Sequence, residues 1–126
     1  MFQHIFSKMA KLDILLKRLG CELKDDNIIS CKGKKEDIKL KFVEKEEIAP
    51  AFGVSYYSDN KILVRKDLPE DIRNHVILHE VAHQLGYRDE LSANLMAFFK
   101  DPTGWLKTAK VTLEDPERRK FYLSKI

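Results

Sequence analysis

Residues 67–86 read DLPEDIRNHVILHEVAHQLG and predict the helix around which the rest of the chain packs. Asp67 is a suitable N-cap residue, Glu70 follows it by three residues, and Pro69 is tolerated in a first turn. Apolar side chains recur on nearly every side of this helix, which predicts that most of its surface is buried. Gly86 is expected to end it.

The chain before this helix predicts one further helix and a small sheet. Apolar residues at helical spacing indicate an amphipathic helix over residues 4–19, with Gly20 as its stop. Asp59-Asn60 lies between two apolar runs and predicts a hairpin turn. The segments with strand-like patterns are residues 27–31, 38–43, 53–58 and 61–65.

Helical patterns dominate the chain after Gly86. A helix is expected to begin near Asp89 and to end at Asp101-Pro102, and the remaining apolar residues predict one or two short covering helices. Strands followed by packed helices predict an α+β fold. We expect residues 1–126 to form a single domain, with a small, mostly antiparallel sheet against the central helix and the helix that follows it.

The central helix contains an H-E-x-x-H sequence, His79-Glu80-Val81-Ala82-His83, which arises by chance in about one in a hundred shuffled chains of this composition. Histidines four residues apart share one helix face, so both imidazoles can reach a single metal ion. Zinc accepts two imidazoles and a carboxylate and leaves a fourth position for water. Glu80 is rotated off that face and can act as general base toward a zinc-bound water. The motif therefore predicts one zinc ion per chain and a hydrolase.

Two acidic residues are candidates for the third ligand. Asp89 fits the pattern H-E-x-x-H-x-x-G-x-x-D, although Asp is also a common N-cap at a helix start. Glu90 would reach the metal from the first turn of the next helix. Small Ala93 and Ala97 would permit that helix to pack closely on the central one, and Asn94 could orient a ligand. The residues alone leave both acids open.

The sequence ELSANLMA at residues 90–97, together with the upstream H-E-x-x-H, resembles the H-E-x-x-H…E-x-x-A-N-x-x-A signature of ImmA/IrrE-like zinc peptidases and their gluzincin-like relatives. The resemblance extends from about Ala51 to Pro102, and it leaves out residues 1–50 and 103–126. It implies a small zincin-like metallopeptidase in which Glu90 is the third ligand. It also implies a narrow protein substrate, such as a transcriptional repressor or another stress or mobile-element regulator.

Two features depart from that signature. The link from His83 to Glu90 is shorter than in many members of the family, and Ser92 stands where Glu or Gln is frequent. The short link keeps Asp89 as the alternative third ligand.

Other polar residues near the motif are weaker candidates. His75 precedes His79 by one helical turn and is expected to be a surface residue at the rim of the cleft. Tyr87 follows the helix and could polarise a substrate carbonyl or simply cover the helix end. Tyr56 and Tyr57 lie on the expected hairpin, whose edge could align an extended peptide by strand addition.

The main alternative to a peptidase is a protein-binding module without catalysis. In that interpretation the zinc site is retained for stability or lost, and residues 1–50 contact a partner. A structural zinc site ordinarily has four protein ligands. Only three good ligands are evident here, which favours catalysis on a protein or peptide substrate.

Composition narrows the remaining classes of function and location. The net charge is +3, without a one-sided concentration of Lys and Arg, so nucleic-acid binding is not expected. No signal-peptide pattern or membrane-span length of apolar residues is visible, and a cytoplasmic location is the default expectation. Cys21 and Cys31 are expected to be free thiols in that reducing environment. The oligomeric state is not predicted.

Overall fold

The computed structural model describes residues 11–25 and 27–124. Residues 11–18 are helical, so the amphipathic helix expected over residues 4–19 is observed in part, and residues 4–10 lie outside the described chain. The elements that follow are β1 (Cys21–Asp25), β2 (Ile28–Cys31), β3 (Ile38–Val43), α2 (Lys45–Ile48), β4 (Gly53–Tyr56), β5 (Lys61–Arg65), α3 (Glu70–Gln84), α4 (Glu90–Lys100), α5 (Pro102–Glu114) and α6 (Pro116–Leu123).

The strands form one five-stranded mixed sheet in the order β1-β2-β3-β5-β4. The pairings β1–β2, β2–β3 and β4–β5 are antiparallel, in agreement with the mostly antiparallel sheet that was expected, although β1 itself was not predicted. Strands β3 and β5 pair in parallel, with Leu40 opposite Ile62. The parallel pairing was not predicted. It arises because the chain passes from β3 through α2 to the edge strand β4. The chain then returns as β5, which lies between β3 and β4. The fold class is α+β.

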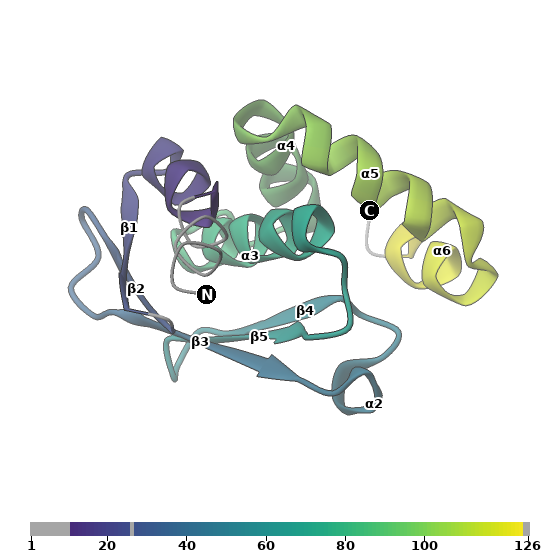
Figure 1. Cartoon of the computed structure of the whole chain (residues 1–126), viewed down its shortest axis with the longest axis horizontal. Helices are drawn as coiled ribbons and strands as arrows, with labels where there is room; N and C mark the ends of the chain where they lie inside the picture. The colour runs from purple at the N-terminus through teal and green to yellow at the C-terminus, as the bar shows by residue number, and fades with distance from the viewer. Residues whose placement is uncertain (1–10, 26, 125–126) are drawn as a thin grey trace, which may run out of the picture.

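Helix α3 lies across one face of the sheet, with the helix of residues 11–18 beside it (Figure 1). The predicted burial of α3 is confirmed, because Ile77, Leu78, Val81 and Ala82 are fully buried. The core joins apolar side chains of three layers: Leu12 and Leu16 from residues 11–18, Ile29, Ile38, Leu40, Ile62 and Val64 from the sheet, and Ile72, Val76, Ile77 and Val81 from α3.

The start of α3 differs from the expectation. Its N-cap is Pro69, which makes no side-chain cap. Asp67 instead accepts two hydrogen bonds from the buried Arg65, at 2.9 and 2.7 Å, and does not cap the helix. The end of α3 is as expected, because Gly86 adopts a φ of 114°, a conformation that L side chains rarely adopt.

Helices α4 and α5 pack on α3, and α6 follows α5 at the end of the described chain (Figure 1). Ala93 and Ala97 have no exposed surface, which fits their expected role in close packing. Arg118 holds α6 in place: its guanidinium lies 4.3 Å from the centre of the Phe52 ring. None of the described helices is both long and apolar enough to cross a membrane.

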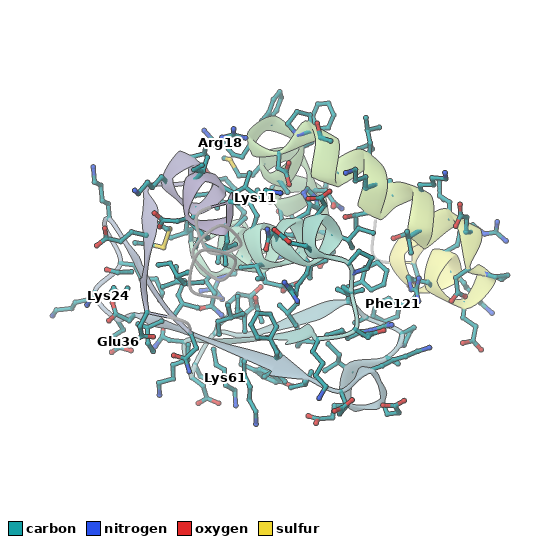
Figure 2. The ribbon with its side chains drawn as sticks, in the orientation of Figure 1. Lys11, Arg18, Lys24, Glu36, Lys61 and Phe121 are labelled. Carbon is teal, nitrogen blue, oxygen red and sulfur yellow. A yellow bond between two sulfur atoms is a disulfide. The ribbon has the colours of Figure 1, made fainter. Side chains whose placement is uncertain are left out.

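Strand β1 and helix α2 were not predicted. Only Cys21 is buried in β1, and α2 has no buried residue, so neither carries a clear apolar pattern. Missing β1 also led to the wrong prediction of free thiols. Cys21 and Cys31 lie directly opposite each other in the β1–β2 pairing and form a disulfide (Figure 2).

We expect this disulfide to stabilise the fold measurably. It joins cysteines 10 positions apart, and closing a loop of that length in the unfolded chain corresponds to about 2–3 kcal/mol. Urea unfolding with and without a thiol reductant should show this loss, and the double variant Cys21→Ser, Cys31→Ser should unfold like the reduced protein in both buffers. Equal midpoints for oxidised and reduced wild type would contradict the expectation.

Candidate metal centre

Three predicted ligands converge where α3 meets the first turn of α4. His79 Nε2 lies 3.2 Å from Glu90 Oε2, and His83 Nε2 lies 3.0 Å from Glu90 Oε1. One ligand atom from each residue can be chosen so that all three lie within 4.8 Å of one another. Two imidazole nitrogens and a carboxylate form a donor set that suits zinc with one open position. The geometry therefore shows a group that could hold a metal ion.

The neighbouring acid, Asp89, has a different role. It is the N-cap of α4, and its side chain accepts a hydrogen bond of 2.8 Å from the Ser92 backbone N–H. The Ser92 hydroxyl donates a second bond of 2.8 Å to the same carboxylate. Of the two acids that the sequence left open, the structure brings Glu90 to the histidines and directs Asp89 to the helix end.

The pKa values of Glu90 and His83 reflect their proximity. Hydrogen bonds from His79 and His83 hold the pKa of Glu90 well below its usual range. Burial disfavours the charged form of His83, but the hydrogen bond to Glu90 and the nearby carboxylate of Glu80 outweigh it and raise the pKa of His83. The Glu90 carboxylate is therefore ready to act as an anionic ligand at neutral pH.

Glu80 lies beside this group in a buried position. Only 7% of its surface is exposed, and burial raises the pKa of its carboxyl. The hydroxyl group of Ser55 from β4 lies 2.9 Å from Glu80 Oε1 and 3.0 Å from the Glu80 backbone carbonyl oxygen, so its single proton is shared between these two acceptors. Burial and Ser55 together fix the orientation of the carboxyl group that the sequence assigns as the general base.

Gly53 allows β4 to approach α3 closely enough for this contact. A Cβ atom at Gly53 would lie 2.7 Å from Val76 Cγ1 and 3.0 Å from Glu80 Cγ. Gln84 adds a second link between the two elements, because its amide donates to the Tyr56 carbonyl at 3.2 Å. The edge strand is thus attached to the helix at Glu80 and, one turn later, at Gln84.

We expect Gly53→Ala to displace Glu80 and to lower stability by about 1–3 kcal/mol, the usual cost of overpacking a buried site. Tyr56→Phe on the same strand is the control, because its ring is exposed. Thermal unfolding of the two variants measures the difference. Equal stability of Gly53→Ala and wild type would show that β4 can move away without cost.

His75 is buried, contrary to the expectation of a surface residue, with 3% of its surface exposed. Its Nδ1 lies 3.1 Å from Asp101 Oδ2, and Asp101 also accepts a hydrogen bond from the Gly104 backbone at the start of α5. Burial lowers the pKa of His75, although Asp101 opposes this effect. The ring is therefore neutral at pH 7, with Nδ1–H donated to Asp101.

A cavity of about 970 Å³ is lined by the three metal-ligand candidates, by Glu80 and by His75. His75, His79, Glu80 and His83 line it from α3, and Glu90 lines it from α4. Tyr57 also lines the cavity, whereas Tyr56 and Tyr87 are not among its lining residues. The sequence analysis did not identify Ser55, Gly53 or Asp101, because no local pattern marks a serine, a glycine or an aspartate that acts on a distant helix.

Comparison of the chain with protein-family models, with curated protein sequences and with solved structures gives no match. The function of this chain is therefore inferred from the geometry of the site.

Proposed function

We propose that this protein is a zinc-dependent peptidase of the H-E-x-x-H type. The observation that carries the proposal is that His79, His83 and Glu90 converge in a cavity that the buried carboxyl group of Glu80 also lines. Three protein ligands would leave one coordination position for water or substrate, which is the pattern of catalytic zinc sites.

Zinc, when bound by these three residues, would supply a Lewis acid that lowers the pKa of water and polarises a peptide carbonyl. Glu80 takes the proton from the attacking water and delivers it to the leaving amine. Burial raises the pKa of this carboxyl group, which increases its affinity for the proton that it takes from the water. Ser55 keeps the carboxyl group in one orientation through its bond to Oε1.

Other groups in the cavity would position the substrate. Strand β4 is at the edge of the sheet and lines the cavity, so an extended peptide can pair with it. Neutral His75 offers an Nε2 lone pair, which can accept a peptide N–H but cannot donate to an oxyanion. Burial raises the pKa of Tyr57, so its hydroxyl group stays protonated and can donate to a substrate carbonyl. Tyr57 therefore takes the place of Tyr87 as the tyrosine that could polarise a substrate carbonyl.

The resemblance to ImmA/IrrE-like peptidases extends the proposal to a zincin-like arrangement and to a regulatory protein, such as a transcriptional repressor, as the substrate. The proposal does not extend to the cytoplasmic location expected from the sequence, because the Cys21–Cys31 disulfide favours an oxidising compartment.

The test is cleavage of a peptide library by the zinc-loaded protein, with the Glu80→Gln variant as the matched control. Cleavage by the wild type alone supports the proposal. If neither protein cleaves any peptide but both bind zinc and a partner, the alternative of a non-catalytic binding module applies.

A further inference from the structure

The cavity that contains the three metal-ligand candidates continues beyond them along α4, α5 and α6. Leu91, Leu95 and Phe98 line it from α4 at helical spacing, and Trp105 and Leu113 line it from α5. Helices α4 and α5 therefore both present large apolar side chains to a space that Glu80 also lines.

We propose that this extension binds an apolar segment of a peptide substrate, with at least two large apolar side chains near the scissile bond, and that α4, α5 and α6 select it. The inference rests on the proposed peptidase function and names the substrate class of the same site.

The size of the cavity leaves room for more than one side chain. Its volume of about 970 Å³ lies at the upper end of the range of roughly 300–1,000 Å³ that encloses a whole drug-sized ligand. A single Leu or Phe side chain would leave most of it unfilled.

The lining side chains are exposed without a ligand. Leu95 is 49% exposed and Leu113 is 54% exposed, although both line the cavity. Covering such apolar surface is favourable in water, so an apolar ligand gains affinity from these residues.

The polar lining favours a peptide over a purely hydrocarbon ligand. Asn94 lines the cavity from α4 beside Leu91 and Leu95. Its amide group can both donate and accept hydrogen bonds. It can therefore bind a peptide main chain, whereas a fatty acyl chain offers it no partner.

The far wall of the cavity is held in place before any ligand binds. Arg118 stacks on Phe52 and lies 3.5 Å from Asp115, so α6 is fixed to the loop before β4 and to its own N-terminus. Phe121 lines the cavity from α6, on the side of that helix that faces the rest of the molecule (Figure 2).

Trp105 provides a direct probe, because it is the single tryptophan of the chain and lines the cavity. Zinc-loaded Glu80→Gln protein would be titrated with two labelled ten-residue peptides that differ only in a central Leu-Phe or Ser-Asn pair. Anisotropy gives the affinity and tryptophan emission gives the location. We expect the Leu-Phe peptide to bind at least about tenfold more tightly and to change the emission of Trp105.

Two substitutions on α5 form a matched pair. Leu113→Asn places a polar group in the cavity, whereas Leu106→Asn changes a residue of similar exposure, 61%, that is not part of the lining. Both residues are largely exposed, so neither change should prevent folding. Leu113→Asn should weaken binding of the Leu-Phe peptide by about tenfold, and Leu106→Asn should leave it unchanged.

The results separate this inference from the function on which it rests. Equal binding of the two peptides, binding without a change in Trp105 emission, or equal effects of the two α5 variants would each overturn the inference. Cleavage of polar and apolar peptides at equal rates would also overturn it while leaving the peptidase intact. Selective binding of the apolar peptide without cleavage by the wild type would support the cavity assignment and reject the peptidase.

Discussion

Replacing Glu80 by Gln is expected to lower the rate of peptide hydrolysis by roughly 100-fold or more, while zinc content and folding remain close to those of the wild type. A positioned general base contributes about 10²–10⁴-fold to a rate, and glutamine keeps the shape of the side chain but cannot accept a proton. The amide can still accept the hydrogen bond from Ser55, which the carboxyl group accepts at 2.9 Å in the wild type. The buried position should therefore remain filled.

The metal-free Glu80→Gln variant should be more stable than the metal-free wild type at high pH. Burial raises the pKa of Glu80, so its ionised form is disfavoured in the folded state. In the metal-free protein, the stability associated with the protonated Glu80 carboxyl is fully present below the unfolded pKa of about 4.3 and is lost as pH rises through the higher folded pKa. Glu80→Gln removes the titration, so the metal-free variant should gain stability relative to wild type above that pKa.

Ser55→Ala tests the orientation of Glu80 separately. It removes the bonds to Glu80 but leaves the carboxylate, so the loss of rate should be smaller than in Glu80→Gln. The rate is measured by product formation from the best peptide of the library, at equal zinc content. A wild type that is no faster than Glu80→Gln would remove the catalytic proposal.

The sequence was sufficient to predict α3, the β4–β5 hairpin and the α+β class, because these features depend on local periodicity and turn residues. The pairing of β3 with β5 could not be predicted. The two strands are separated by α2 and β4, and each strand would satisfy its apolar pattern next to several different partners. The disulfide was missed for a related reason: it requires β1, whose single buried residue gives no pattern.

The same difference between local patterns and long-range contacts applies to the candidate site. His79, Glu80 and His83 are fixed by helical geometry within one motif, so their arrangement follows from spacing. Ser55 acts on Glu80 from 25 residues away, and Asp101 binds His75 from 26 residues away. Such contacts depend on which elements the tertiary fold brings together. The burial of His75 could not be inferred either, because it results from α5 packing on α3.

Removing a metal ligand is expected to abolish near-stoichiometric zinc binding. Glu90→Gln removes the anionic ligand, and His83→Ala removes a ligand from the helix. Changes to groups that only support a ligand typically cost about 10–100-fold in metal affinity. Loss of a ligand should cost at least the upper end of that range. Elemental analysis after zinc reconstitution should find close to one zinc ion per wild-type chain and much less in either variant.

Thermal unfolding provides a second measurement of the same loss. At a free zinc concentration about 100 times the wild-type dissociation constant, binding stabilises the folded state by about 2.7 kcal/mol. A 100-fold weaker variant at the same concentration would gain only about 0.4 kcal/mol. The zinc-dependent rise in melting temperature should therefore almost disappear in Glu90→Gln and His83→Ala.

Asp89→Asn is the control that separates the two acids next to the motif. Asparagine is as good an N-cap as aspartate, so the bond from the Ser92 backbone can be retained and stability should change by less than about 1 kcal/mol. Zinc content should not change, because the Asp89 side chain caps α4 while Glu90 contacts both histidines. If Asp89→Asn loses zinc while Glu90→Gln retains it, the third ligand is Asp89, and the first turn of α4 must rearrange when the metal binds.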